Sequence, residues 1–416
     1  MLLTASFRTC FIHRPAFVLA VGLCCGLPAA AGHAADAVAV AASGGAAVIE
    51  RVGELGGKTI AAEDGTISAI TINDGSGVTA DDLRLFGDLE GLKTLTVLNC
   101  RTIDDAALES LGARLPLRSL AVTNSAITDA GAAWIAASYP DLEELDLSSN
   151  TNLTGAAMKS IASLAKLKRL SLVQTRFNDL HTRRLKALEN LEVLDLRGNM
   201  EAGDLTMGVV GKLPKLRAFK HRSTIVTDDG IERLAAGEQL AALLMQDFAI
   251  TSAAGPHLAG CKKLTSLEIF RCQGFGSPGA LALAGMPLTR LTLRDLPQVG
   301  DDALAVMAQL PQLERLALHE LASVGDAGLA QLAGASKLRA LDIWALPLVS
   351  DASAKVIAEL PALEELSLRE TGITARGIEA ILANEKLRSL TYRGDLPATT
   401  LVKIRAREWK KLDIAP

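Results

Sequence analysis

The sequence predicts an α/β solenoid, a right-handed horseshoe with a concave parallel β-sheet and short helices on its convex side. Three observations predict this fold. Leucines recur in the spacing Leu-x-x-Leu-x-Leu every 24 or 25 residues, and a signature such as Thr-Asp-x-Gly follows many of these motifs. Hydrophobic residues make up 49% of the chain but aromatic residues only 3%, which suits a core of small identical layers. Because a repeat array can use a whole chain as one domain, a length of 416 residues does not require several domains.

The first leucine of the motif occurs thirteen times in one register. These leucines are Leu92, Leu117, Leu142, Leu167, Leu191, Leu216, Leu240, Leu264, Leu288, Leu313, Leu338, Leu363 and Leu387. One degenerate unit stands at each end, with Ile67-x-x-Ile70-x-Ile72 before the series and Trp409-x-x-Leu412-x-Ile414 after it. We therefore expect about fifteen strands, with atypical terminal units that act as caps.

Each repeat predicts a strand, a loop and a helix. The alternation in Leu-x-Leu is typical of a short strand with one buried face, which stacks in parallel on the next unit. A helix is predicted after each strand, as at Ile127-Thr128-Asp129-Ala130-Gly131, because Thr caps the first amides and Asp suits the helix dipole. Apolar residues within 301–309 predict a helix of two to three turns. Neighbouring strands stand about 4.8 Å apart and packed helices roughly 8–10 Å apart, so the stack bends with its strands on the inside.

Residues 1–35 are interpreted as a secretory signal peptide. Arg8 and Arg14 precede an apolar run over 16–27, and small residues allow cleavage after Ala31 or Ala34. This run is shorter than the roughly 20 apolar residues of a membrane span, so we expect no integral span after cleavage. An uncleaved anchor is the alternative.

The remaining chain divides by composition and repeat register. An Ala/Gly-rich linker is expected over 36–46, and an N-terminal helix and hairpin cap with the first degenerate strand over 47–73. The repeat array and its C-terminal cap follow over 74–416. Within the cap, 58–62 is expected to pair with 66–72 and to cover the edge of the first repeat.

Charge and cysteine content narrow the class of protein. The net charge of −4 and the lack of a long basic block disfavour nucleic acid and anionic lipid as partners. Loss of the signal peptide would leave Cys100, Cys261 and Cys272, an odd number that gives no disulfide framework. We expect buried structural thiols, since free cysteine is among the most buried residue types.

The repeats resemble the cysteine-containing class of leucine-rich repeats, known from eukaryotic F-box proteins and from secreted bacterial proteins. The resemblance covers Ile67 to Pro416. Three positions after the last leucine, that class has a small or polar residue, found here at Cys100, Ser125, Asn150, Thr175, Asn199, Cys272 and Thr371. Apolar residues stand there at Phe248, Leu296, Leu321 and Leu346, where we expect looser hydrogen bonding.

The ends of the array also bear on the resemblance. Residues 47–58 look like the helix and Gly-Gly-Lys turn that open many bacterial members of this class. An F-box-like helical block before the repeats is not found in the sequence, which disfavours a ubiquitin-ligase role.

Catalytic motifs are missing from the sequence. There is no His-Glu-x-x-His, and His181, His221, His257 and His319 fall in different repeats. The glycine-rich run 274–279 lacks the lysine of a phosphate-binding loop and falls between a strand and a helix. We therefore expect no enzyme activity, no cofactor and no metal site.

Alternate strand positions face out of the concave sheet and are free to bind. Before the last motif leucine the chain has Asp146, Asp195, Lys220, Glu268 and Asp342. After it the chain has Arg197, Arg222, Gln246, Phe270, Arg294, His319, Trp344, Arg369 and Arg393. Because Arg and aromatic residues are enriched in binding hot spots, we predict a concave binding site of Arg197, Arg222, Glu268, Phe270, Arg294, His319, Asp342, Trp344, Arg369 and Arg393. The alternative is a solvated face on which these side chains pair with Asp195, Glu268 and Asp342.

The sequence therefore predicts an exported, non-enzymatic recognition scaffold, monomeric and either secreted or held in the periplasm or cell envelope. Its partner is expected to be a protein or peptide, with a surface glycan as a further ligand class and no role for nucleic acid. The alternatives are a structural cell-envelope protein without a specific ligand and, less favoured, a ubiquitin-ligase-type substrate adaptor.

Overall fold

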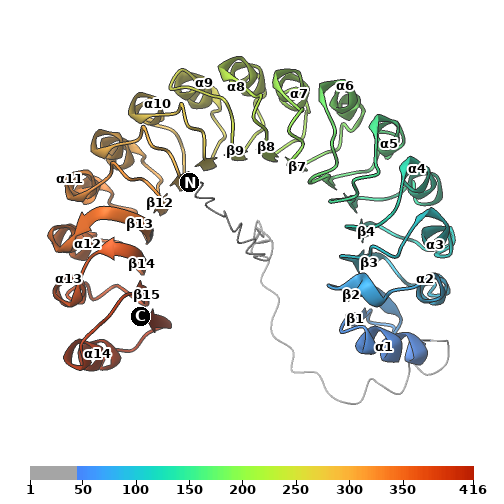
Figure 1. Cartoon of the computed structure of the whole chain (residues 1–416), viewed down its shortest axis with the longest axis horizontal. Coiled ribbons are helices and arrows are strands. Elements are labelled where there is room, and N and C mark those ends of the chain that lie inside the picture. The colour runs from blue at the N-terminus through green and yellow to red at the C-terminus, as the bar shows by residue number, and fades with distance from the viewer. Residues whose placement is uncertain (1–44) are drawn as a thin grey trace, which may run out of the picture.

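The repeats form one arc with strands on its inner side and helices on its outer side (Figure 1). This arrangement is seen in the computed structural model, which describes residues 45–416. The strands make one open 16-stranded sheet in sequence order. All neighbours are parallel except β1 and β2, which pair antiparallel as a hairpin. The predicted horseshoe is confirmed, whereas the predicted signal peptide of residues 1–35 and residues 36–44 of the predicted linker lie outside the described residues.

The strands follow the motif register. Their bounds are β1 Lys58–Ala61, β2 Ile67–Ile72, β3 Thr94–Val97, β4 Ser119–Val122, β5 Glu144–Asp146, β6 Arg169–Ser171, β7 Val193–Arg197, β8 Ala218–Arg222, β9 Ala242–Gln246, β10 Ser266–Phe270, β11 Arg290–Arg294, β12 Arg315–His319, β13 Ala340–Ser350, β14 Glu365–Gly372, β15 Ser389–Arg393 and β16 Lys411–Ala415. Strands β2 to β16 are the fifteen units that the repeat count predicts.

A helix follows nearly every strand. The α-helices are α1 Gly45–Glu54, α2 Ala80–Gly87, α3 Asp105–Glu109, α4 Asp129–Ser138, α5 Gly155–Ile161, α6 Asp179–Thr182, α7 Asp204–Val210, α8 Asp228–Ala235, α9 Ala254–Gly260, α10 Ser277–Leu281, α11 Asp326–Ala330, α12 Ala354–Glu359, α13 Ala375–Ile381 and α14 Ala398–Arg405. The 3₁₀ helices are η3 Gly75–Gly77, η4 Arg183–Ala187, η5 Asp301–Gln309, η6 Gln331–Gly334 and η7 Asp351–Ser353. The helix expected over 301–309 is thus a 3₁₀ helix, the tighter form with hydrogen bonds three residues apart.

The core runs along the arc between sheet and helices. Motif leucines such as Leu145, Leu194 and Leu293 are buried and stand opposite the equivalent leucine of the next strand. Cys100, Cys261 and Cys272 are buried free thiols, which confirms their structural role. Burial raises the pKa of Cys100 and Cys261 to about 11 and that of Cys272 to about 12, so these thiols are unreactive at neutral pH.

A second set of contacts joins successive helix N-termini. The aspartate at the first position of one helix accepts from the backbone amide, and often the hydroxyl, of the residue that caps the next helix. Asp204 accepts from Thr227 N and Oγ1 at 2.8 and 2.7 Å. Equivalent acceptors are Asp105, Asp129, Asp179, Asp228, Asp301, Asp326 and Asp351. We call these contacts the aspartate ladder.

The ladder explains the glycine of the Thr-Asp-x-Gly signature. A Cβ added at Gly230 would overlap the carboxylate of Asp204, and one at Gly131 would overlap that of Asp105. The small residue leaves room for the aspartate of the preceding repeat. The signature therefore encodes contact between repeats as well as the start of a helix.

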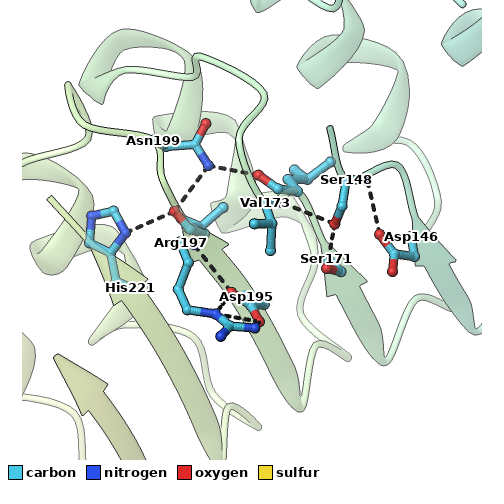
Figure 2. A network of polar contacts seen from close by, with 10 residues as sticks. Asp146, Ser148, Ser171, Val173, Asp195, Arg197, Asn199 and His221 are labelled. Atoms are coloured by element: carbon cyan, nitrogen blue, oxygen red, sulfur yellow. Dashed lines mark hydrogen bonds and ion pairs between the residues drawn. The ribbon is translucent and has the colours of Figure 1, made fainter. Parts of the chain in front are cut away.

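Polar side chains bridge the loops that leave the strands in the first half of the arc. Asn199 donates through Nδ2 to the carbonyls of Leu172 and Leu196 at 2.7 and 3.0 Å (Figure 2). Asn150 makes the same pair of bonds with Val122 and Leu147. The loop bonding expected from the repeat class is present there.

The looser bonding expected at Leu346 is wrong. Strand β13 continues through this residue for eleven residues in all, and Leu346 pairs with Thr371 of β14. The backbone itself makes the hydrogen bonds where no polar side chain is available, because buried amides and carbonyls must be paired. The apolar side chain of Leu346 fills the core beneath.

The residue that follows the first motif leucine forms a row just before the strands, and part of this row alternates in charge. Its members along the arc are Lys93, Arg118, Glu143, Lys168, Glu192, Arg217, then Ala241, Thr265 and Thr289, then Glu314, Arg339, Glu364, Arg388 and Lys410. The sign alternates from Arg118 to Arg217 and from Glu314 to Arg388. Lys168 pairs with Glu143 at 2.6 Å, Arg217 with Glu192, and Arg339 with Glu364 at 2.7 Å. Within the gap, Thr265 and Thr289 instead donate to backbone carbonyls. We call this row the charge row.

Candidate binding site on the concave face

Three residues of each strand motif face the concave side. We call the residue before the second motif leucine the leading column, the residue before the last leucine the middle column, and the residue after the last leucine the trailing column. Parallel pairing in register places each column in a continuous line across the strands. The columns therefore form three parallel lines of side chains around the inside of the arc.

The trailing column contains most of the predicted site. Arg197 stands opposite Arg222, Phe270 opposite Arg294, Arg294 opposite His319, His319 opposite Trp344, and Trp344 opposite Arg369. Its arginine side chains are about one-third exposed, for example 32% at Arg294 and 28% at Arg369. Their stems pack on the sheet while their guanidinium groups remain within reach of a ligand.

A ladder of arginine and aromatic contacts runs along this column. The Arg294 guanidinium lies 4.3 Å from the Phe270 ring centre and 5.0 Å from that of Trp344, and Arg369 lies 5.4 Å from Trp344 on the other side. Arg271 adds a third arginine at 4.5 Å from Phe270. Such stacking fixes planar groups at roughly 0.5–2 kcal/mol each. We call this set the arginine–aromatic ladder.

Carboxylates hold the ladder from the residue that follows the trailing column. Asp247 accepts from both Arg222 and Arg271, Glu320 accepts from Arg294 at 2.7 Å, and Glu370 accepts from Trp344 Nε1 at 2.9 Å. Hydrogen bonds from Arg271 and Arg222 lower the pKa of Asp247 against the opposing effect of burial. The ladder is thus ordered before any ligand arrives.

The residues that follow the trailing column have a positive φ, a backbone conformation that was not predicted from the sequence. Asp247, Arg271, Glu320 and Glu370 all have φ between 50° and 61°. Asparagine and glycine favour this left-handed region, and they hold the same place at Asn99, Asn124, Gly198 and Gly394. The turn aims each acidic side chain at the strand before it.

Asp342 joins two predicted residues in the middle of the site. It accepts from His319 Nε2 at 3.0 Å and from Arg369 Nη2 at 3.0 and 3.1 Å. Burial alone would raise the pKa of Asp342, but His319 and Arg369 outweigh it and lower the pKa to about 2. The structure therefore brings Phe270, Arg294, His319, Asp342, Trp344 and Arg369 into one cluster.

The remaining predicted residues lie outside this cluster. Arg197 forms a two-pronged pair with Asp195 of its own strand, with Nη2 and Oδ2 2.7 Å apart (Figure 2). Arg222 lies two strands before Phe270, linked to it through Asp247 and Arg271. Arg393 pairs with Asp413 at 2.8 Å near the end of the arc.

Glu268 is the exception among the predicted acids. It makes no hydrogen bond or ion pair within residues 45–416, and burial raises the pKa of Glu268. Burial also lowers the pKa of Lys220, two strands away in the same middle column. The pairing of Arg side chains with Asp195 and Asp342 is present, and the pairing with Glu268 is not.

A groove of about 1040 Å³ lies on the concave face across β11 to β16. Its floor is the middle column, where small residues stand at Thr292, Ala317, Ser367 and Thr391. Arg369 and Arg393 of the trailing column border it on one side. The groove overlaps the C-terminal half of the predicted site.

The leading column forms the other border and was missed by sequence reasoning. It contributes Arg290, Arg315, Glu365 and Lys411 to the groove. Arg315 reaches over Ala340 to Glu365 two strands away, at 3.0 and 3.3 Å. The leading column stands two residues before the middle column in each motif, so the repeat register alone would have identified it.

Other kinds of site are not found in the described part of the chain. Residues 45–416 contain no cluster of three or more His, Cys, Asp or Glu side chains that could hold a metal ion. The glycine-rich run 274–279 spans a short loop and, from Ser277, the first turn of α10, with Phe275 buried. None of the helices within 45–416 is long and apolar enough to cross a membrane.

Comparisons with known proteins support the fold. A family model described as leucine-rich repeat region matches residues 116–402. A search of curated protein sequences gives no match.

Three solved structures are similar in fold. The internalin InlF of Listeria monocytogenes has 18% identity and a TM-score of 0.53, with 84% of this chain and 94% of that chain covered. A chain of the yeast Rad7 and Elc1 complex has 18% identity and a TM-score of 0.51, with 76% and 79% covered. A chain of the TLR13–ssRNA13 complex has 17% identity and a TM-score of 0.50, with 80% and 58% covered. At these identities the likeness shows the fold alone.

Proposed function

Since this chain belongs to the leucine-rich repeat family, we propose that it is an exported, non-enzymatic recognition protein that binds a protein or peptide partner on its concave face. The groove across β11 to β16, with Arg369 of the arginine–aromatic ladder on its border, is the observation that carries the proposal. Export rests on the signal-peptide pattern of residues 1–35. Leucine-rich repeats fix a shape and leave the ligand to variable surface positions, so the site argument rests on this groove.

The order already present in the ladder supports a binding role. A guanidinium that is stacked and hydrogen-bonded in the free protein loses little conformational entropy when a partner docks. Arg294 is held between Phe270 and Trp344 and by Glu320. Trp and Arg in such settings are the residues that most often dominate interface energies.

A structural cell-envelope protein is the second candidate, and self-pairing favours it. The Arg222–Asp247, Arg294–Glu320 and Arg369–Asp342 pairs satisfy the column without a ligand. Under this alternative the concave face stays solvated and the groove stays empty.

Site-specific cross-linking separates the two candidates. A photo-reactive residue placed at Ser367 or Thr391 in the groove is expected to cross-link a partner in the source organism, whereas the same residue at Lys355 on the convex helix α12 is not. The triple change Arg294→Ala, Trp344→Ala and Arg369→Ala should abolish the groove cross-link, with folding checked by circular dichroism. Cross-linking that is equal at Lys355, or that persists in the triple variant, would contradict binding at this face.

A further inference from the structure

We propose that the groove binds an extended acidic peptide segment whose carboxylates pair with Arg290 at one end and with Lys410 and Lys411 at the other. This inference rests on the proposed function and adds the chemistry of the partner. It concerns Arg290, Lys410 and Lys411 at the two ends of the groove, which are not among the site residues predicted from the sequence.

The charge inventory of the groove is unbalanced. Six basic and three acidic side chains line it. Each acid already has a basic partner in the groove, in the pairs Arg315–Glu365, Arg369–Asp342 and Arg393–Asp413. Arg290, Lys410 and Lys411 are left without an ion-pair partner within residues 45–416. The groove thus carries three uncompensated positive charges on a chain whose net charge is −4.

Arg290 is the most constrained of the three. Its Nε atom is buried and has no hydrogen-bond acceptor within the described residues. On the next strand its direct neighbour is Arg315, a like charge that is committed to Glu365. A buried donor without an acceptor is costly, and so is an arginine facing another arginine. An incoming carboxylate that pairs with the guanidinium group would offset the repulsion between Arg290 and Arg315.

The distance between the ends sets the length of the peptide. Arg290 lies on β11 and Lys411 on β16, five strand spacings apart, or roughly 24 Å at about 4.8 Å per strand. An extended peptide covers that distance in about seven residues at roughly 3.3 Å each. The small side chains of Thr292, Ala317, Ser367 and Thr391 leave room for its backbone along the floor.

The placement of the acids favours a peptide over a nucleic acid. A single strand of RNA or DNA carries a phosphate at every nucleotide, so its charge would run the full length of the groove. Asp342 and Glu365 lie along that path between its two ends and disfavour a continuous row of phosphates. A peptide with carboxylates only at its two ends meets the unpaired cations and passes the acids with a neutral backbone.

The test is a selection of random twelve-residue peptides displayed on phage against the full protein. Enriched peptides are expected to carry two acidic residues about seven positions apart. A fluorescent synthetic copy should lose affinity by about tenfold or more in Arg290→Gln and in the Lys410→Gln/Lys411→Gln double variant, because each removes a charge pair. Replacing either peptide carboxylate by its amide should lower the affinity for the wild-type protein by a similar factor. Lys159→Gln and Lys355→Gln, exposed on convex helices, serve as matched controls.

Several results would overturn the inference. These are no enrichment, enrichment of neutral or basic peptides, or affinity that is unchanged in the Arg290 and lysine variants. Binding of an octa-uridylate in the same groove, with the same dependence on Arg290, would replace the peptide by nucleic acid. If a partner cross-links at Ser367 while the selected peptides are neutral, the acidic-partner inference fails and the proposed function stands. If both experiments are negative, both fail.

Discussion

His221 stands where its motif calls for a leucine, and it is fully buried. Its Nδ1 lies 3.0 Å from the Leu196 carbonyl oxygen and its Nε2 lies 2.8 Å from that of Ala202 (Figure 2 shows the first contact). The ring stacks on Phe219, with centres 5.6 Å apart. A residue that looked like an isolated polar exception in the sequence therefore bonds the loop of the preceding repeat.

Replacing His221 with leucine should lower the free energy of unfolding by about 1–3 kcal/mol at pH 7, because a buried carbonyl loses its donor. Burial lowers the pKa of His221 in the folded state. Wild type therefore loses stability as pH falls through the unfolded value near 6.5, where only the unfolded chain gains a proton. The variant lacks this slope, so the difference should shrink between pH 7 and pH 5 in urea unfolding.

His257 on α9 provides the control for that experiment, since it is half-buried and makes no hydrogen bond within the described residues. His257→Leu should change stability little at either pH. A difference between wild type and His221→Leu that grows at pH 5 would contradict the expectation. It would mean that the buried ring is cationic and donates to both carbonyls.

At the scale of elements, the aspartate ladder couples each helix to the next. Each carboxylate satisfies amides of the following helix, which have no partner within that helix. Asp179, for example, accepts from the amides of Gly203 and Thr206 at 2.8 and 2.9 Å. Short helices of four to ten residues are marginal alone, so this coupling and core packing hold them.

Asp204→Ala is expected to destabilise the protein by about 1–2 kcal/mol, because Thr227 loses an acceptor for both its amide and its hydroxyl. Chemical unfolding followed by circular dichroism measures the change. Asp229→Ala is the matched control, since Asp229 also lies in the first turn of a helix but makes no bond to another repeat within the described residues. Equal losses in the two variants would assign the effect to the helix dipole alone.

The strands and their register could be predicted because the motif period fixes both. The length of β13 could not, since an apolar residue at Leu346 was compatible with a loose loop as well as with continued pairing. The trailing column was identified for the same reason as the strands. Its partners Asp247, Glu320 and Glu370 were not, because their direction depends on a positive φ, which few non-glycine residues adopt. The groove is formed by large side chains of the leading and trailing columns on either side of small side chains in the middle column, so it could not be predicted from one column alone.

At the scale of the whole molecule, the sheet formed within residues 45–416 is open, with β1 and β16 at its two ends. Strand β16 pairs only with β15, and it presents exposed Lys411 beside exposed Lys410. Lysines on an edge strand oppose pairing with a second chain. Lys410 and Lys411 therefore protect the end of the sheet as well as carrying charge into the groove.

Lys410→Val with Lys411→Val should produce concentration-dependent self-association, since an apolar open edge can accept another strand. Light scattering after size-exclusion chromatography measures the mass. Lys159→Val with Lys355→Val, two exposed changes on convex helices, should leave the mass unchanged. Association in both variants would point to general loss of surface charge, and association in neither would show that another feature protects the edge.

The charge row constrains which changes in repeat number would keep opposite charges adjacent. From Arg118 to Arg217 the sign alternates at every repeat, so loss of one repeat would set Glu143 against Glu192, whereas loss of two would keep opposite signs together. From Glu314 to Arg388 the sign alternates again, but in the opposite phase. The three uncharged repeats at Ala241, Thr265 and Thr289 separate the phases. Insertion or removal of two repeats therefore keeps opposite charges adjacent within either alternating segment, whereas a change by one repeat keeps them adjacent only in the neutral segment between the two.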